Sequence, residues 1–352
     1  MREFLQGNIV AVKSAIANGL DFFCGYPITP STEALEYAAE HMDPKHFINA
    51  FSELETINLM YGFGSAGKRS MTGTSGCGLS LMREGLSYMV GAKVPGVLYN
   101  VMRYGPGLGG ITPSNEDINI VWGTGHGQSK VPVFTPSTVQ EIADCMMYAF
   151  DIADALRIPV LVMPDATLGQ MYEPVEIHSS TFKIAKDWAI GQHKRIDISS
   201  RKTTSKTVQS YKSYENEMEE QTDFILDREK NMLSTCKIFM GDSLTGGHAE
   251  TVKVAYSDHP GANYGKFIVG IGTTGRVIQE VAKQLHVGSI VPILLNPLDT
   301  FKLKDVKELI VVEVGGTGLF DIMKYHFPDA KIKSIVFSHT IPDVEEVIER
   351  MK

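Results

Sequence analysis

The stretch DFFCGYPITPST, residues 21–32, contains the signals that decide the fold. Its apolar residues 22–24 are typical of a short buried strand, and the two prolines that follow mark a rigid turn. Ser31 or Thr32 then supplies a side-chain oxygen that can cap a helix reaching about His41. A strand, a turn and a helix in direct succession predict one unit of an α/β protein.

The same succession recurs through the first half of the chain. Short apolar segments predict strands near 47–51, 71–74, 96–101, 131–134 and 159–163, and helical spacing predicts helices at 8–18, 53–66, 78–92 and 138–156. Strands that alternate with helices predict a mostly parallel sheet covered on both faces. Such sheets bind ligands at the carboxyl ends of their strands, so we expect a site among the loops 25–31, 74–78 and 101–113.

The second half of the chain differs in composition. A basic run over 183–206, either a solvated linker or a surface for anions or a partner, precedes a long amphipathic helix predicted from the apolar spacing between Tyr211 and Met232. Residues 242–265 are predicted to form an exposed loop. The α/β alternation then resumes with strands at 267–271, 290–295 and 309–314 and helices at 276–285 and after Pro342. We therefore expect a first domain at 1–180, a helical connector and loop at 181–262, and a smaller α/β domain at 263–352.

Composition excludes several function classes. The chain has 352 residues with 33 Lys+Arg and 41 Asp+Glu, so its net charge of 33 − 41 = −8 argues against nucleic acid as the main partner. Its four cysteines are scattered without a C-x-x-C pair, which disfavours a disulfide scaffold and a self-contained iron–sulfur or zinc site. No apolar run reaches the ~18–20 residues of a membrane span, and the first residues lack a signal peptide. A cytoplasmic protein is expected.

A glycine-rich motif at 270–275 fits the pattern G-x-G-x-x-G between a strand and a helix. That pattern can bind a dinucleotide phosphate at the helix N-terminus. The acidic residue that should bind ribose is missing from the end of the next strand, where Asn296 and Pro297 stand instead. The motif therefore favours a tight structural turn over an NAD(P) site.

Three segments of the first domain carry chemical signals. Two prolines hold the Thr29 hydroxyl and its backbone in one geometry, although the segment alone favours a rigid entry turn to the helix. Glu53 and Glu55 open a helix, where a carboxylate either complements the helix dipole or binds a ligand nitrogen. Arg103 ends a strand beside a loop with four glycines, and an arginine there either binds a carboxylate or phosphate or is merely exposed.

Taken together, these segments resemble one family. Residues 25–32, Ser52-Glu53 with Ile57-Asn58, MTGTSGCGLSL at 71–81, NVMRYGPGLGGITP at 100–113 and Gly125-His126-Gly127 occur in the order seen in the alpha-type subunit of 2-oxoacid:ferredoxin oxidoreductases. The chain is most similar to the 2-oxoisovalerate and 2-oxoglutarate enzymes. The resemblance implies a parallel-sheet domain that binds the pyrimidine end of thiamine diphosphate, plus a smaller domain like the transketolase C-terminal domain.

The resemblance also implies roles for individual residues. Glu53 matches the glutamate that bonds the pyrimidine ring and so activates the cofactor, a task that needs a dry carboxylate. Thr29 matches a threonine near the substrate, and Arg103 matches the arginine that orients the 2-oxoacid carboxylate. His126 is a further candidate for substrate contact. The remaining cofactor-binding positions implied are Tyr26, Pro27, Ile28, Ser75 and Gly76.

The reaction implied is the coenzyme A-dependent oxidative decarboxylation of a 2-oxoacid, with electrons passing to ferredoxin. No metal ligand is expected on this chain. Magnesium and the pyrophosphate-binding half of the site are expected on a beta-type partner, and the iron–sulfur clusters on gamma-type and small ferredoxin-like subunits. Rival interpretations are a thiamine diphosphate enzyme of the transketolase or decarboxylase kind and a non-catalytic scaffold subunit. Cys77 and Tyr104 depart from the family pattern and leave the choice of 2-oxoacid open.

Overall fold

The structure, a computed structural model, describes most of the chain. The described residues are 2–180, 182, 184–186, 189, 208–241, 250–256, 265–300, 303 and 305–352. Most of the basic run at 183–206 and much of the predicted loop at 242–265 lie outside them.

The larger sheet has seven strands in the order β12-β6-β7-β5-β4-β2-β3. They are β2 (Phe22–Gly25), β3 (Phe47–Asn49), β4 (Ser70–Thr74), β5 (Gly96–Asn100), β6 (Val133–Phe134), β7 (Pro159–Val162) and β12 (Leu294–Asn296). Every pair of neighbours is parallel except β12 with β6. The α/β class and the mostly parallel sheet are thus confirmed.

In the described part of the chain, the helices that flank these strands are α1 (Gly7–Ala17), α2 (Thr32–His41), α3 (Glu53–Ser65), α4 (Gly76–Gly91) and α5 (Val139–Leu156). Right-handed crossovers place α2 and α5 on one face, because the chain moves from β2 to β3 and from β6 to β7 in the same direction. From β3 to β4 and from β4 to β5 the chain moves in the opposite direction. These crossovers therefore place α3 and α4 on the other face. The contacts agree, since α1 packs on α2 and α5 while α3 packs on α4.

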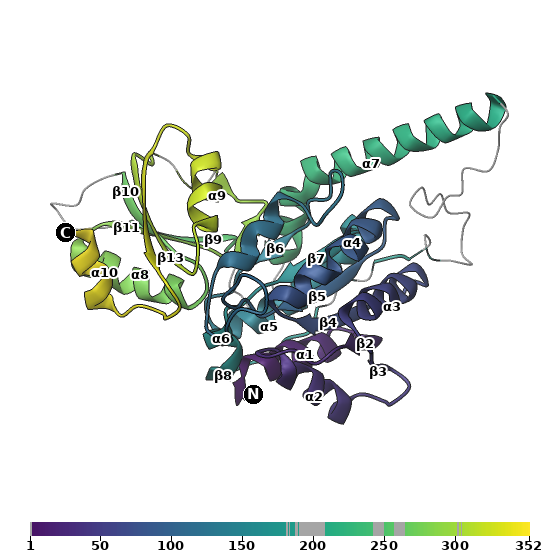
Figure 1. Ribbon diagram of the computed structural model, residues 1–352, viewed down its shortest axis with the longest axis horizontal. Helices are drawn as coiled ribbons and strands as arrows, with labels where there is room; N and C mark the ends of the chain where they lie inside the picture. Colours follow the sequence, from purple (N-terminus) through teal and green to yellow (C-terminus); the bar gives the residue numbers. More distant parts are fainter. Residues whose placement is uncertain are drawn as a thin grey trace.

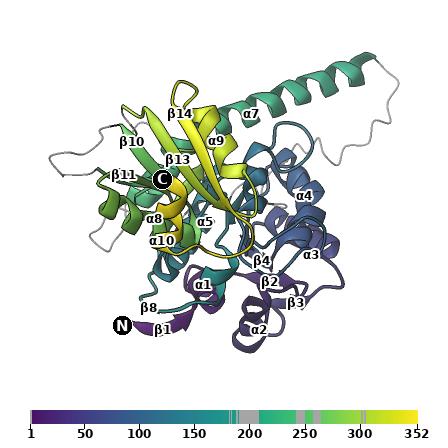
Figure 2. The same cartoon turned by 60° about the vertical axis from the view of Figure 1, so that its left-hand side comes forward.

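A second sheet, in the order β14-β13-β10-β11-β9, lies beside the first (Figures 1 and 2). Its strands are β9 (Val252–Ala255), β10 (Lys266–Val269), β11 (Gly288–Pro292), β13 (Glu308–Val314) and β14 (Lys331–Phe337). It carries the helices α8 (Gly272–Leu285), α9 (Gly318–His326) and α10 (Val344–Met351). Only β9 runs antiparallel to its neighbour among these paired strands.

The predicted strand at 290–295 is in fact divided between the two sheets. β11 ends at Pro292, and β12 begins at Leu294 and pairs antiparallel with β6 of the larger sheet. Thr135 fixes the crossing, because its amide donates to the Ile293 carbonyl at 2.8 Å and its hydroxyl to the Pro292 carbonyl at 2.9 Å. A continuous apolar run cannot reveal that its two ends pair with different partners.

The predicted loop at 242–265 contains the edge strand β9, so that part of the prediction was wrong. Its alternation of Val252, Lys253 and Val254 is too short to stand out among Gly, His and Asp neighbours. The ribbon of β1 (Glu3–Gln6) with β8 (Tyr172–Val175) and the short helices α6 (Ala166–Gln170) and η1 (Glu116–Trp122) are further elements absent from the prediction.

The predicted long helix is present as α7 (Val208–Gly241). Its C-terminal half packs on the body of the protein, where Met232, Cys236 and Met240 are buried at four-residue spacing. Arg228 adds a hydrogen bond from Nε to the Leu156 carbonyl at 3.0 Å. The other half of α7 extends away from both sheets (Figure 1).

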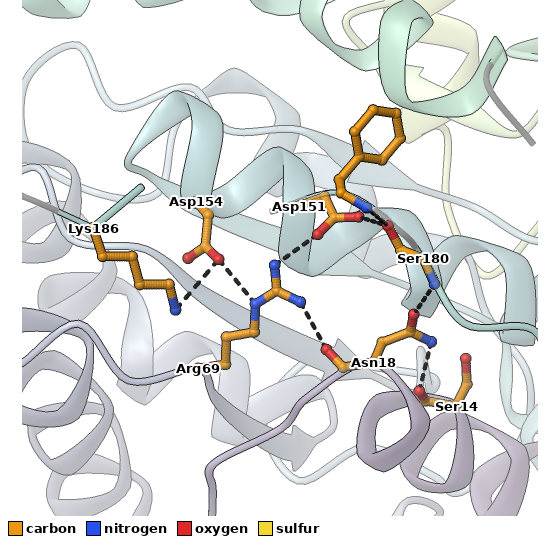
Figure 3. A network of polar contacts seen from close by, with 8 residues as sticks. Ser14, Asn18, Arg69, Asp151, Asp154, Ser180 and Lys186 are labelled. Carbon is orange, nitrogen blue, oxygen red and sulfur yellow. Dashed lines mark hydrogen bonds and ion pairs between the residues drawn. The ribbon is translucent and has the colours of Figure 1, made fainter. Parts of the chain in front are cut away.

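An ionic network around Arg69, which includes the buried Asp151 and Asp154, lies at the amino end of β4 (Figure 3). Its guanidinium donates to Asp151 Oδ1 at 2.6 Å, to Asp154 Oδ2 at 2.9 Å and to the Asn18 carbonyl at 2.7 Å. Burial lowers the pKa of Arg69, but the charges of the two aspartates outweigh it and raise the pKa overall. The network thus ties α1, β4 and α5 together at the edge of the sheet opposite to the predicted ligand loops.

Candidate active site

The strand order places a topological switch point between β2 and β4 at the carboxyl edge of the larger sheet. From β2 the chain runs outward to β3, whereas from β4 it runs in the opposite direction to β5. The segments that leave these two adjacent strands therefore diverge to opposite faces of the sheet. Such a switch point is where open α/β sheets bind their ligands. The loops after β2 and β4 are two of the three that the sequence singled out.

The loop after β2 presents its predicted residues on the surface. Tyr26, Pro27 and Thr29 are exposed, and Ile28 is half-buried. The Ser31 hydroxyl donates to the Ile28 carbonyl at 2.9 Å instead of capping α2, which tightens the turn from within. The Thr29 carbonyl accepts a hydrogen bond from Arg103 Nη1 at 2.6 Å. The structure therefore brings Thr29 and Arg103 together.

Arg103 follows β5 and is 5% exposed. Its Nη2 donates to the Leu108 carbonyl at 2.7 Å and lies 3.2 Å from the Cys77 sulfur. A side chain at Gly76 would press on Arg103, since an added Cβ would lie 3.2 Å from its Cγ and Nε. A guanidinium has five N–H donors. After these three bonds, Nε–H and one Nη1–H of Arg103 have no partner among the described residues.

Glu53 occupies the first position of α3, directly after the Ser52 N-cap, whose hydroxyl accepts from the Glu55 amide at 3.2 Å. The Glu53 side chain is 6% exposed, and its carboxylate has no hydrogen-bond partner among the described residues. Glu55 lies on a different side of the helix, where its carboxylate accepts from the Phe51 amide at 2.6 Å. Because no described residue donates to the Glu53 carboxylate, it is available to a hydrogen-bond donor that the chain itself does not supply.

The space beside Glu53 is kept open by a glycine. A Cβ at Gly78 would lie 2.8 Å from Glu53 Oε1 and 2.4 Å from the Thr74 hydroxyl. That hydroxyl is itself buried without a partner. Both polar groups thus converge on the first turn of α4, whose N-terminal dipole favours the carboxylate charge. A ring that offers an N–H donor fits these groups, so the residues suit the aminopyrimidine of thiamine diphosphate.

Asp117, in η1, belongs to the same cluster, although no pattern in the sequence predicts its presence there. Its Oδ2 accepts from the Gly76 amide at 3.2 Å and from Asn100 Nδ2 at 3.0 Å. Burial raises the pKa of Asp117, and the hydrogen bonds to Asn100, Gly76 and the Arg103 backbone oppose that rise. Its partners are 17 and 41 residues away in sequence, and no local pattern signals such a contact. Asp117 fixes the ends of β4 and β5 to each other.

Ser75 and Gly76 were both predicted from the sequence and lie in this cluster. In each of them a polar group is hydrogen-bonded to another residue of the chain. The Ser75 hydroxyl donates to the Val101 carbonyl at 2.6 Å and is fully buried. Gly76 adopts φ +42°, a conformation that favours glycine, and its amide is bound to Asp117. Their contribution to the site is to hold the turn that precedes α4.

His126 is not brought to the other predicted residues. It lines a separate cavity of about 690 Å³ formed by the end of α4, the 125–129 loop and α7. The Ser87 hydroxyl donates to the His126 carbonyl at 2.8 Å, and Arg83 binds the Thr124 carbonyl at 3.1 Å. Because Ser87 is eleven residues after Gly76 on the same helix, His126 lies ~16 Å along α4 from the site.

The glycine-rich motif at 270–275 has a structural role. At the start of α8, the Thr273 amide donates to Asp165 Oδ2 at 2.6 Å and the Thr273 hydroxyl to Oδ1 at 2.8 Å. A Cβ at Gly272 would lie 2.3 Å from Asp165 Oδ2, so only glycine permits this approach. A carboxylate of the chain thus occupies the position where a dinucleotide phosphate would bind.

Two kinds of feature are absent from the described residues. No group of three or more His, Cys, Asp or Glu side chains there could hold a metal ion. No described helix is long and apolar enough to cross a membrane. Cys24, Cys145 and Cys236 are buried free thiols, and Cys77 is a half-buried one beside Arg103.

Comparisons with known proteins agree with this geometry. Residues 13–234 match the thiamine diphosphate-binding family of pyruvate flavodoxin/ferredoxin oxidoreductases. The chain is 35% identical over 316 residues to ketoisovalerate oxidoreductase subunit VorB of Methanothermobacter thermautotrophicus, covering 87% of this chain and 83% of the relative. It is 39% identical over 183 residues to 2-oxoglutarate synthase subunit KorA of Methanocaldococcus jannaschii, covering 51% of this chain and 50% of the relative.

A solved structure shares the fold. It is a 2-oxoglutarate:ferredoxin oxidoreductase from Magnetococcus marinus with 2-oxoglutarate, coenzyme A and succinyl-CoA bound. The match has a TM-score of 0.75 at 22% identity and covers 99% of this chain but 64% of that chain. The family match spans more than half of the chain, and VorB is similar over most of its length. This chain therefore belongs to the pyruvate flavodoxin/ferredoxin oxidoreductase family of thiamine diphosphate-binding proteins.

Proposed function

We propose that this chain is the alpha-type subunit of a 2-oxoacid:ferredoxin oxidoreductase. The complex would convert 2-oxoisovalerate or 2-oxoglutarate and coenzyme A to an acyl-CoA and CO₂, with the released electron pair passing to ferredoxin. The observation that carries the proposal is the Glu53 carboxylate, buried without a protein donor beside an opening kept clear by Gly78. The VorB match over 87% of the chain puts 2-oxoisovalerate first among the substrates.

Thiamine diphosphate, when bound, supplies a carbon nucleophile for the 2-oxo carbonyl and stabilises the charge left by decarboxylation. The residues of this chain would bind the cofactor ring and orient the 2-oxoacid. Glu53 would form a hydrogen bond with a ring nitrogen, because its carboxylate lies in the site without a donor among the described residues. The two free N–H groups of Arg103 and the exposed Thr29 hydroxyl would bind the carboxylate of the 2-oxoacid. We do not extend this proposal to His126, which lines the other cavity.

The segments that border the site support a partner subunit. Phe51 is 90% exposed and Leu108 is 79% exposed, one next to the Glu53 turn and the other in the loop that binds Arg103. Leu54 and Leu81 extend this apolar border along α3 and α4. Exposed apolar patches of this kind mark protein interfaces. We infer that a beta-type subunit carrying magnesium and the pyrophosphate site docks there.

Other features belong to the same proposal. Four scattered cysteines cannot hold the clusters that electron transfer needs, so gamma-type and small ferredoxin-like subunits would carry them. We place the complex in the cytoplasm and retain 1–180, 181–262 and 263–352 as its working domain division. A transketolase-like or scaffold role is not favoured, because the named relatives are oxidoreductase subunits.

A reduction assay tests the proposal. The complex, reconstituted with its beta-type partner, thiamine diphosphate and Mg²⁺, is supplied with pyruvate, 2-oxoisovalerate, 2-oxoglutarate or indolepyruvate, and reduction of a viologen dye is followed. We expect coenzyme A-dependent reduction with 2-oxoisovalerate or 2-oxoglutarate. Decarboxylation without dye reduction would contradict the oxidoreductase assignment, and activity confined to pyruvate or indolepyruvate would contradict the substrate assignment.

A further inference from the structure

A small cavity of about 200 Å³ lies between the two sheets and shares no residue with the candidate active site. Its walls come from the end of η1, Lys130, the C-terminal half of α7, β12 with the segment that follows it, and α9. At its rim Trp122 of η1 meets Tyr325 of α9 edge-to-face, with ring centroids 5.4 Å apart. The cavity is therefore built jointly by elements that cover both sheets.

Two opposite charges line this cavity without neutralising each other. Lys130 and Glu229 form neither an ion pair nor a hydrogen bond with any described residue, and Glu229 Oε1 is buried without a partner. Burial and the neighbouring Lys130 ammonium lower the pKa of His326, so this third polar group stays neutral near pH 7. Charges held in a partly buried wall are costly unless something pairs with them. An anion alone would leave Glu229 unpaired, and a cation alone would leave Lys130 unpaired.

The rest of the wall is aliphatic. Met232, Leu295, Leu298 and Ile322 line the cavity, and each is at most 5% exposed. Binding of a short branched hydrocarbon against such a surface is favourable, by ~25 cal/mol for each Å² of apolar area removed from water. A small ligand with both charges and an apolar side chain would satisfy the whole lining.

We propose that this cavity binds an α-amino acid with a small aliphatic side chain, of the size of valine. Its carboxylate would pair with Lys130, its ammonium group with Glu229, and its side chain would lie against Met232 and Ile322. This inference does not depend on the proposed function, because none of these residues contacts the Glu53 cluster. Since the ligand would touch α7, α9 and the segment after β12 at once, it would also fix the two sheets relative to each other.

Isothermal titration calorimetry on the full 352-residue chain tests the proposal. The probes are L-valine and three compounds that each lack one of its parts: isobutylamine without the carboxylate, isovalerate without the ammonium group, and glycine without the side chain. We expect saturable binding of valine, with a dissociation constant at least ~10-fold lower than that of each truncated compound, because a charge-assisted bond in a partly buried site is worth about one decade in affinity. Binding of isobutylamine or isovalerate as tight as that of valine would overturn the proposal, as would an absence of saturable heat with valine.

Variants check the assigned groups. Lys130→Met and Glu229→Gln should each weaken valine binding at least ~10-fold. The matched variants Lys333→Met and Glu345→Gln change exposed residues of the smaller sheet and α10 and should leave it unchanged. Valine binding that survives both cavity variants would contradict the proposed pairing. If a cavity variant fails to fold, the probe series on the unaltered chain still decides the question.

Discussion

At the scale of single residues, Glu55 provides a matched control for a substitution at Glu53. They are two positions apart on α3, yet the Glu53 carboxylate is buried toward Gly78 while that of Glu55 binds the Phe51 amide. We expect Glu53→Gln to lower viologen reduction by the reconstituted complex at least ~100-fold, because an amide cannot share the proton that a carboxylate shares. Glu55→Gln keeps an oxygen for the Phe51 amide and should retain nearly full activity. Similar activity in the two variants would show that Glu53 is not the activating acid.

Two glycines provide a second comparison at this scale. Gly78→Ala would place a methyl group 2.8 Å from Glu53 Oε1 and 2.4 Å from the Thr74 hydroxyl, so the carboxylate must move and activity should fall at least ~10-fold. Gly62→Ala in α3 meets nothing within 4 Å and should raise the free energy of unfolding by up to ~1 kcal/mol through helix propensity. Activity assays and urea melts of both variants check this. An active Gly78→Ala enzyme would mean that the opening beside Glu53 is not used.

At the scale of secondary-structure elements, Glu313 makes the packing of α9 on β13 sensitive to pH. Its fully buried carboxylate accepts from the Leu319 amide at 2.7 Å and from the Ser334 hydroxyl at 2.9 Å, and burial raises its pKa from 4.5 to about 7. Between those values the folded state holds a proton that the unfolded state has released. The contribution of Glu313 to stability is therefore largest at low pH and declines as pH rises toward about 7.

Glu313→Gln isolates this contribution. The amide can accept from the Leu319 amide and donate to the Ser334 hydroxyl, so the contacts survive without the titration. We expect the unaltered chain to lose ~3 kcal/mol more than the variant between pH 5 and pH 8, measured as free energy of unfolding in urea. Parallel pH profiles for the two proteins would contradict the assigned titration.

At the scale of the whole molecule, the sequence predicted what local patterns can specify. The strand–turn–helix unit at 21–41 and the long helix α7 follow from apolar spacing and turn chemistry, and the structure contains both. The crossing of β12 to the larger sheet and the contacts of Asp117 and Asp165 were not predicted. They join segments far apart in sequence, such as Asp165 with Thr273 at a separation of 108 residues, and no local pattern encodes such a pairing.

The candidate site was predictable to a similar degree. The loops after β2, β4 and β5 could be located because parallel sheets bind ligands at one edge, and the structure brings Thr29, Glu53 and Arg103 to that edge. His126 shares a sequence neighbourhood with the site but lies on another cavity, because the 125–129 loop follows α4 away from the sheet edge. Position along the chain was therefore a poor guide to position in space.

We propose that this chain supplies one half of an active site shared with a beta-type subunit. The most direct test is 2-oxoacid-dependent viologen reduction by the purified chain, with and without the beta-type partner, in the presence of thiamine diphosphate, Mg²⁺ and coenzyme A. We predict no turnover by the chain alone and full turnover once the partner is added. Full activity of the isolated chain would show that this chain holds the complete active site, which contradicts a shared one.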